Sequence, residues 1–341
     1  MSDLTIRREG HAGWITLSRP EALNALSHQM ALDIEAALRD WQQDAGVALV
    51  ILDAAGDKAF CAGGDIRQMY DTGRAGDYAY GRRFWRDEYR MNALLAGYPK
   101  PVVSFLQGFV MGGGVGVGCH VAHRVVGESA RIAMPECGIG LVPDVGGSLL
   151  LARAPGHLGA YLGLTGARMA PGDAIHAGFA DHFLPEADWP ALKAALCAAG
   201  TPAPLMKATR PAPPSRLAEN QDYIDALFAP GTLPGIRAAL AEESGDDIAD
   251  RALKALDAGC PLSMAATLEM LDRLHDASDI TEALRLEYRF TARAMEHGDF
   301  IEGIRAQIID RDRKPRWRHG LDIAPEVVAA MLAPLEEELA L

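Results

Sequence analysis

The glycine-rich stretch at residues 108–118, GFVMGGGVGVG, constrains the fold of this chain more than any other segment. It holds six glycines in eleven residues and follows the apolar run PVVSFL at 101–106. Ordering a glycine in regular structure costs about 0.5–1 kcal/mol relative to alanine, so we expect the close approach of another backbone or of a ligand to offset this cost. The pattern predicts a strand, a tight turn and a helix that begins within the glycines.

Two common nucleotide-binding motifs are absent from this stretch. The dinucleotide motif needs glycines at positions i, i+2 and i+5, and the glycines at 112, 113, 114, 116 and 118 contain no such triple. The phosphate loop needs a Gly-Lys pair, and the sequence has none. Two interpretations remain: N–H groups at a helix start that hold a partial negative charge, or glycines that let two elements pack closely.

Charge and composition narrow the class of protein. The net charge of −13 argues against a general nucleic-acid or acidic-membrane partner, because binding to phosphate backbones needs a basic face. No run of 18 apolar residues occurs, and the first residues lack the apolar core of a signal peptide, so we expect a soluble, cytoplasmic protein. The odd number of cysteines without paired spacing fits reduced thiols: Cys61, Cys119, Cys137, Cys197 and Cys260.

Apolar periodicity divides the chain into an α/β part and a helical part. Strands are expected at residues 13–18, 47–53, 101–106, 125–127 and 131–134, and helices at 31–41, 78–97, 149–153, 157–164 and 170–177. The strand, helix and strand at 13–53 suggest a right-handed crossover. Proline-rich residues 201–215 break the periodicity, and from 216 the chain reads only as helices. We therefore predict a core at 1–200, a linker at 201–215 and a C-terminal helical region at 216–341.

Three motifs together resemble one known family. The segments FCAGGDI at 60–66 and MGGG at 111–114, with the pair Pro135-Glu136, resemble the crotonase (enoyl-CoA hydratase/isomerase) superfamily. Within it the chain is most similar to the 3-hydroxyisobutyryl-CoA hydrolases, through segments at 134–147 and 302–317. The similarity covers residues from about 4 to about 318 and is weakest in the proline-rich segment.

This resemblance implies a fold and a ligand. The fold would be an α/β spiral of strand-strand-helix turns with helices at its C-terminal end. The ligand would be an acyl-CoA whose thioester oxygen lies between the backbone N–H groups of Gly64 and Gly113. The sequence agrees, because both glycines follow a predicted strand and Gly113 is placed to begin a helix. Two such donors would stabilise an oxyanion.

The carboxylates of the family pattern favour hydrolysis over hydration. Hydratases of the superfamily resemble one another in using two glutamates, and here the first of these positions is Gly116, whereas the second is Glu136. A single carboxylate beside a thioester suits hydrolysis, in which Glu136 either attacks the carbonyl or deprotonates a water. The sequence leaves both routes open.

Two further carboxylates match the hydrolase pattern. Asp144 would contact the substrate or position water and the departing thiol, and Glu88 would accept a hydrogen bond from a 3-hydroxyl group. Each has an ordinary alternative: Asp144 follows a proline and could be a turn or capping residue, and Glu88 could lie on a solvated helix face.

The anionic coenzyme needs cations despite the negative total charge. We expect its phosphates near basic residues beside the motif loops, and its adenine at backbone groups around Ala62 and Asp65. An isolated surface cation is often only solvated. The candidate cations are Arg19, Lys58, Arg67 and Lys100.

No metal site is expected. Cys119, His120 and His123 have suggestive spacing, but a structural zinc site needs a second ligand pair, which is missing. Cys61 and Cys137 adjoin the predicted site, and buried packing explains them better than a nucleophilic thiol does.

These observations predict an acyl-CoA thioester hydrolase that acts on a short branched 3-hydroxyacyl-CoA such as 3-hydroxyisobutyryl-CoA, in valine breakdown. We expect no cofactor, because coenzyme A arrives with the substrate. Association of identical chains stays open, since the longer helical tail could fold back on its own core. Two alternatives remain: an enoyl-CoA hydratase or isomerase that uses Glu136 alone, and a non-catalytic acyl-CoA-binding protein.

Overall fold

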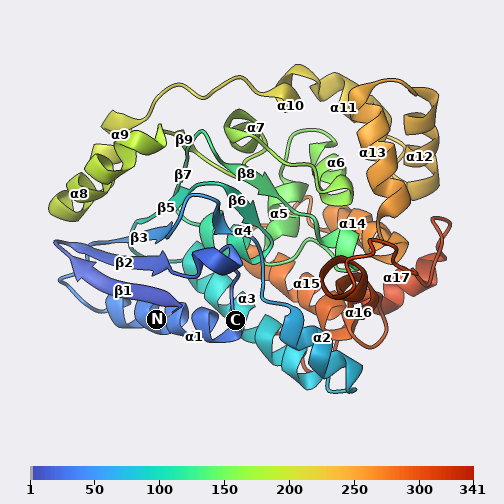
Figure 1. The fold of residues 1–341 in the computed structure, drawn as a ribbon, viewed down its shortest axis with the longest axis horizontal. Helices are drawn as coiled ribbons and strands as arrows, with labels where there is room; N and C mark the ends of the chain where they lie inside the picture. Colours follow the sequence, from blue (N-terminus) through green and yellow to red (C-terminus); the bar gives the residue numbers. More distant parts are fainter. Residues whose placement is uncertain (1–2) are drawn as a thin grey trace. The chain divides into compact units, whose positions relative to one another are not determined.

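A computed structural model describes residues 3–341 (Figure 1). The chain forms two compact units, each assembled from separated segments. Unit 1 holds the chain up to Asp65, then Arg90–Ala133 and Arg168–Glu219. Unit 2 holds Ile66–Tyr89, Met134–Ala167 and Asn220–Leu341. The two units therefore alternate along the sequence.

Unit 1 is built on two sheets. The larger has the strand order β1-β2-β3-β5-β7-β9, and the smaller has the order β4-β6-β8. β1 pairs antiparallel with β2, and all other strand pairs are parallel. The strands are β1 (Leu4–Glu9), β2 (Ala12–Leu17), β3 (Leu49–Ala54), β4 (Ala59–Cys61), β5 (Val102–Leu106), β6 (Phe109–Met111), β7 (His123–Val126), β8 (Arg131–Ala133) and β9 (His182–Phe183).

Successive strand pairs are shared between these sheets in a regular way. From β3 onward, the first strand of each pair joins the larger sheet and the second joins the smaller sheet, and a helix follows most pairs. This is the predicted α/β arrangement of strand-strand-helix turns. Parallel strands covered on both faces are expected to be apolar throughout, and β5, VVSFL, is buried at every residue.

The helices of unit 1 cover these sheets. α1 begins at His28, where the Ser27 side chain accepts a hydrogen bond from the N–H of Met30 at 3.2 Å, and it buries one face. The core behind the larger sheet includes Trp14, Phe105 and Trp189. The helices are η1 (Pro20–Ala22), α1 (His28–Gln42), α4 (Gly113–Gly118), α7 (Pro171–His176), η3 (Glu186–Asp188), α8 (Trp189–Ala199), α9 (Ala203–Ala208) and α10 (Arg216–Glu219).

Unit 2 is helical. Within it, α14 packs against α5 and α6, and α11, α12 and α13 pack side by side (Figure 1). The part of α3 up to Tyr89 belongs to unit 2, and the rest of α3 belongs to unit 1. The helices of unit 2 are α2 (Arg67–Arg74), α3 (Ala79–Ala96), η2 (Glu136–Ile139), α5 (Gly147–Ala152), α6 (Leu158–Thr165), α11 (Gln221–Phe228), α12 (Leu233–Glu242), α13 (Asp247–Ala258), α14 (Pro261–Arg273), α15 (Ile280–Ala294), α16 (Phe300–Ile304), the π-helix η4 (Arg305–Ile309) and α17 (Pro325–Met331).

Most expected elements are present within one to four residues of their predicted ends, and the chain from 216 to 341 is helical as predicted. β1 was not predicted, because its sequence LTIRRE is an exposed edge strand with little apolar patterning. The proline-rich segment contains α9 and is fixed in place, since Ser215 Oγ donates to Asp173 Oδ1 at 2.8 Å. Between residues 3 and 341, no helix is both long and apolar enough to cross a membrane.

Candidate active site

The glycine-rich stretch forms the expected strand, turn and helix in unit 1. β6 ends at Met111, and α4 begins at Gly113. Gly112 has φ 47° and ψ −119°, a conformation that favours glycine, and its carbonyl accepts hydrogen bonds from Val115 and Gly116. The N–H of Gly113 lies in the first turn, where no partner exists within the helix.

The glycines of α4 permit a close backbone approach. A Cβ on Gly114 would lie 2.3 Å from the carbonyl oxygen of Cys61, at the end of β4. The second interpretation of the stretch is therefore correct for Gly114, because another backbone lies against it. The same contact places the start of α4 beside the loop that carries Gly64.

Gly64 has its own N–H directed away from its neighbouring strand. Leu26 forms a parallel bridge to Gly64, in which it donates to the carbonyl of Gly63 at 2.9 Å and accepts from the N–H of Asp65 at 2.8 Å. Since a parallel bridge uses the two flanking residues, the N–H of Gly64 points to the other side. A Cβ on Gly63 would lie 3.7 Å from the Met111 carbonyl, so this loop adjoins the end of β6.

Several of the predicted coenzyme-binding groups of unit 1 already form hydrogen bonds within the protein. Arg19 donates to Asp65 Oδ2 at 3.1 Å and to the Ala25 carbonyl at 2.9 Å, so it braces the Gly64 loop. The N–H groups of Ala62 and Asp65 bond to the carbonyls of Leu23 and Leu26. These two N–H groups are therefore not available to an adenine.

The remaining predicted cations differ in their surroundings. Lys100 donates through Nζ to the carbonyls of Trp41 and Asp44, which close the end of α1. Lys58, in unit 1, and Arg67, in unit 2, are exposed. Lys100 therefore has a structural role, and the phosphate-binding roles of Lys58 and Arg67 stay predictions.

Four of the buried carboxylates in unit 2 form one set, which consists of Glu88, Glu136, Asp144 and Glu287. We call this set the acidic cluster. Burial raises the pKa of each, because removal from water disfavours the charged form. The charge of Asp144 further raises the pKa of the other three, which shows that the members interact.

Asp144 has a specific partner, Tyr89. The Tyr89 hydroxyl donates to Asp144 Oδ2 at 2.7 Å and lies 3.5 Å from Thr291 Oγ1. Burial raises the pKa of Asp144 to about 7, and the bond from Tyr89 opposes this increase. Tyr89 was not singled out in the sequence, although it follows Glu88 directly.

Glu287 fixes the segment that follows Asp144. It accepts hydrogen bonds from the N–H groups of Gly146 at 2.8 Å and Ser148 at 3.2 Å, and from the Ser148 hydroxyl. These groups are at the start of α5, so Glu287 on α15 caps that helix. Burial raises the pKa of Glu287 to about 8. Nothing near Glu287 in the sequence signalled this role, because its partners are about 140 residues away.

Two members of the cluster have unsatisfied oxygen atoms. Glu136 Oε2 and Glu88 Oε1 are buried and have no hydrogen-bond partner among the described residues. Buried polar atoms are almost always paired in folded proteins, so an orphaned oxygen needs an explanation such as a catalytic role or a ligand. Asn92, on α3, also has two buried amide atoms without a partner among residues 3–341.

Comparison with known proteins identifies the family. The model of the family Enoyl-CoA hydratase/isomerase matches residues 12–332. The chain belongs to this family.

Two groups of relatives extend this result. The chain is 36% identical to "3-hydroxyisobutyryl-CoA hydrolase, mitochondrial" of Gallus gallus, over 98% of this chain and 89% of that protein. It resembles the structure of an enoyl-CoA hydratase from Rhodobacter sphaeroides 2.4.1 at 59% identity and TM-score 0.96, over the whole of both chains. It also resembles a carnitinyl-CoA dehydratase from Mycobacterium thermoresistibile at 41% identity and TM-score 0.95, over 100% of this chain and 99% of that chain.

Family membership confirms the crotonase-type fold with its C-terminal helical region. The site residues carried by the family motifs occur in two places in the structure. Gly64 and Gly113 lie on neighbouring segments of unit 1, whereas Glu88, Glu136 and Asp144 form the acidic cluster of unit 2 together with Glu287. Their catalytic roles stay predictions.

The cysteines of the motifs are buried thiols. Burial raises the pKa of Cys119 to about 12 and raises that of Cys137 as well, which opposes the thiolate form that metals and nucleophilic catalysis need. Among residues 3–341, no group of three or more His, Cys, Asp and Glu side chains is arranged to hold a metal ion.

Proposed function

We propose that the protein hydrolyses the thioester of a short branched 3-hydroxyacyl-CoA, such as 3-hydroxyisobutyryl-CoA, to the free acid and CoA. The curated relatives that cover most of the chain make it an acyl-CoA thioester hydrolase. The branched 3-hydroxy acyl group and a place in valine breakdown are inferred from the names of those relatives.

The acidic cluster is the observation that carries this proposal. Glu136 is buried, its pKa is raised by burial and by Asp144, and its Oε2 has no partner among the described residues. A desolvated carboxylate with a free oxygen is a strong nucleophile or base once it is ionised. Gly116, buried in α4, supplies no carboxylate at the position where a hydratase would need one.

The proposed reaction breaks the carbon–sulfur bond of the thioester. In one route Glu136 attacks the carbonyl carbon, CoA leaves as the thiolate and takes a proton, and water then hydrolyses the acyl anhydride. In the other route Glu136 removes a proton from a water that attacks the same carbon. Both routes pass through an oxyanion, for which we assign the N–H groups of Gly64 and Gly113 as donors. Loss of one such donor typically costs about 3–4 kcal/mol of transition-state stabilisation.

Glu88 and Asp144 are assigned to substrate recognition and proton transfer. The unpartnered Oε1 of Glu88 would accept a hydrogen bond from the 3-hydroxyl group. A buried site built to bind a hydroxyl discriminates against substrates that lack it, because the polar group is then left unpaired. Asp144, with a pKa raised to about 7, can exchange a proton near neutral pH and would supply it to the departing thiolate.

Hydration of an enoyl-CoA is the second candidate, because the similar structures are named as a hydratase and a dehydratase. The two reactions give different signals. We expect 3-hydroxyisobutyryl-CoA to release free thiol, which a thiol reagent detects, and we expect no loss of enoyl absorbance with 2-enoyl-CoA substrates. Loss of enoyl absorbance without thiol release would establish the hydratase instead, and binding of acyl-CoA without either reaction would indicate a non-catalytic protein.

The role of Glu136 can be tested during turnover. If Glu136 is the nucleophile, hydroxylamine added during turnover should trap the anhydride, and mass spectrometry should find a hydroxamate in the peptide that contains residue 136. General-base catalysis would leave the side chain of residue 136 unmodified. We expect the reaction to need no cofactor. The expected cytoplasmic location stays a prediction, because several relatives carry "mitochondrial" in their names.

A further inference from the structure

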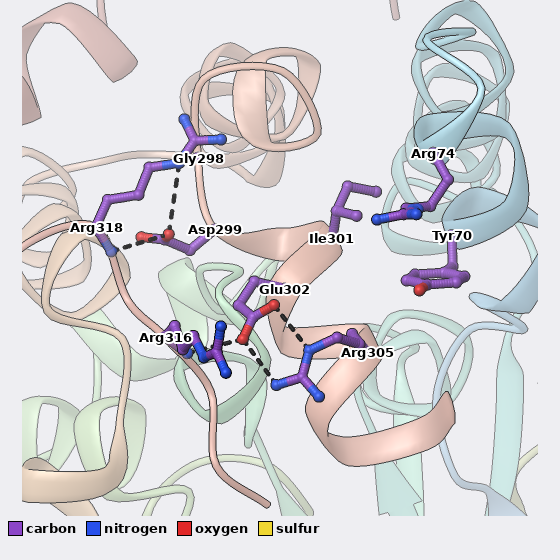
Figure 2. Close-up of a pocket in the computed structure, with 9 residues that line it drawn as sticks. All are labelled: Tyr70, Arg74, Gly298, Asp299, Ile301, Glu302, Arg305, Arg316 and Arg318. Atoms are coloured by element: carbon purple, nitrogen blue, oxygen red, sulfur yellow. Dashed lines mark hydrogen bonds and ion pairs between the residues drawn. The ribbon is translucent and has the colours of Figure 1, made fainter. Parts of the chain in front are cut away.

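A pocket in unit 2, distinct from the acidic cluster, has a basic lining. Its volume is about 230 Å³, and α2, the start of α16, η4 and the segment after η4 contribute its walls. Figure 2 shows its residues, with Arg74 across the pocket from Arg316 and Arg318. The lining residues are Tyr70, Arg74, Gly298, Asp299, Ile301, Glu302, Arg305, Arg316 and Arg318.

The acidic residues of the pocket are already paired. The Glu302 carboxylate accepts hydrogen bonds from Arg305 Nε at 2.9 Å and from Arg305 Nη2 at 2.8 Å. It also accepts a hydrogen bond from the backbone N–H of Arg316 (Figure 2). Asp299 lies 3.7 Å from Arg318 Nε and accepts from the backbone N–H of Arg318. These carboxylates therefore have little capacity to neutralise further cations.

Arg305 is also fully engaged. In addition to Glu302, its Nη1 binds Asp310 at 2.6 Å and Asp312 at 2.8 Å. These hydrogen bonds raise the pKa of Arg305 further above its ordinary value. Arg305 therefore holds the walls of the pocket together and offers no free charge to a ligand.

Two cations remain available. Among the described residues, neither the guanidinium of Arg74 nor that of Arg316 has a hydrogen-bond or ion-pair partner within the distance of a salt bridge, and both side chains are exposed. They come from separate elements, α2 and the segment after η4. Hydrogen bonds from Arg305 lower the pKa of Glu302, and the charge of Arg316 lowers it further. Four arginines and two carboxylates line the pocket, so its lining is basic in a chain of net charge −13.

The backbone around the pocket is unusual. η4 is a π-helix, a rare form that occurs frequently at functional sites. The following residues Arg311 and Arg313 have φ of 56° and 55°, a conformation that residues other than glycine rarely adopt. Asp310 and Asp312, which alternate with these two residues, are the ones that bind Arg305.

We propose that this pocket binds a phosphate group. Guanidinium groups bind phosphate oxygens through paired, charge-assisted hydrogen bonds. Arg74 and Arg316, with Arg318 also in the lining, would contact the anion from different sides, which suits a tetrahedral anion better than a planar carboxylate. The volume is below the roughly 300–1,000 Å³ that a whole drug-sized ligand occupies, so the pocket would hold the phosphate and not an entire coenzyme.

The test uses the whole protein and inorganic phosphate as the probe. Calorimetric titration at constant ionic strength, with chloride replacing phosphate, separates binding from general screening of charge. We expect saturable binding to the wild type and about a tenfold or larger increase in Kd for the double variant Arg74→Gln/Arg316→Gln, since charge-assisted hydrogen bonds are lost. Arg83→Gln, at an exposed arginine of α3 outside the pocket, is the matched control and should bind as the wild type does.

Enzyme kinetics then distinguish the two sources of the phosphate. If the substrate's coenzyme supplies it, the double variant should have a raised KM for acyl-CoA and an unchanged KM for the acyl-pantetheine thioester, which has no phosphate. If a separate phosphate compound binds, both KM values should be unchanged while the phosphate Kd still rises.

The proposal is overturned if phosphate and CoA bind equally well to the wild type and to a double variant that unfolds at the wild-type temperature. Because the titration needs no turnover, this result would be independent of a failure of the proposed hydrolase activity.

Discussion

Tyr89 and Asp144 control the charge of the acidic cluster. The Tyr89 hydroxyl stabilises the carboxylate of Asp144, whose pKa burial raises to about 7. The pKa of Asp144 in turn affects Glu88, Glu136 and Glu287, because an ionised Asp144 raises the pKa of each. A substitution at Tyr89 should therefore change the pH range in which the cluster works.

We predict that Tyr89→Phe moves the basic limb of the kcat/KM profile to higher pH. Removal of the hydrogen bond removes an interaction that lowers the pKa of Asp144, so Asp144 keeps the proton that it would supply to the departing thiolate up to a higher pH. The measurement is kcat/KM for thiol release between pH 5.5 and 9. Tyr98→Phe, which removes a hydroxyl bonded to the Leu38 carbonyl in unit 1, is the control and should leave the limb in place. An unshifted limb in Tyr89→Phe would refute this role.

The sequence could predict some members of the cluster and not others. Glu88, Glu136 and Asp144 were identified because they lie in or near motifs with a recognisable spacing. Tyr89 bonds to a residue 55 positions away and Glu287 to one 141 positions away, and no local pattern encodes such a pairing. Glu287 lies in a helix whose sequence, ITEALRLEYRFTARA, shows only an ordinary mixture of charged and apolar residues.

The position of α4 depends on its glycines. We predict that Gly114→Ala destabilises the protein by about 1–3 kcal/mol or more and lowers activity, because the new Cβ would meet the Cys61 carbonyl, which is backbone and does not easily move. Urea denaturation and thiol release would measure the two effects. Gly320→Ala is the control, since a Cβ there has no neighbour within 4 Å. Equal stability of both variants would contradict this packing.

The cap of α5 should make stability depend on pH. The pKa of Glu287 is raised from 4.5 to about 8 in the folded protein, so the folded state holds a proton that the unfolded state has released between these values. Its contribution to stability is complete below about pH 4.5 and is lost as pH rises to about 8.

The glutamine of the Glu287→Gln variant does not titrate. We therefore predict that the free energy of unfolding of the variant, minus that of the wild type, increases from pH 5 to pH 8 and then stays constant. Urea denaturation at several pH values would show this, with exposed Glu326→Gln as a control that should follow the wild type. Parallel curves for Glu287→Gln and the wild type would mean that Glu287 does not hold its proton in this range.

Helices and strands were predicted correctly from the sequence where apolar segments are bounded by glycine or proline. The helix start at Gly113 followed from glycines after an apolar strand, and α3 followed from a long run that ends at Pro99. The pattern failed for β1, where only Leu4 is buried, because pairing with β2 and not burial holds that strand. The hydrogen bonds from Lys100 to two backbone carbonyls could not be predicted either, because those carbonyls lie at the end of another helix, α1.

Unit 2 joins the middle of the chain to its C-terminal end. α5 and α6 pack on α14, and Glu287 of α15 caps α5. We predict that a fragment of residues 1–200 does not form α5 and α6 in their native arrangement, because their packing partners are missing. Hydrogen exchange should show rapid exchange over 147–165 in the fragment and protection in the full chain. Protection in the fragment would instead support an independent core at 1–200, as predicted from the sequence.

We propose that Glu136 carries out thioester hydrolysis. Free thiol released from 3-hydroxyisobutyryl-CoA by the full chain is the most direct test, with Glu136→Gln compared to the exposed Glu242→Gln. We predict a decrease in kcat of about 10²–10⁴-fold for Glu136→Gln, with an unchanged fold by circular dichroism, and wild-type activity for Glu242→Gln. A folded Glu136→Gln variant that keeps thiol release within a few-fold of the wild type would contradict the claim.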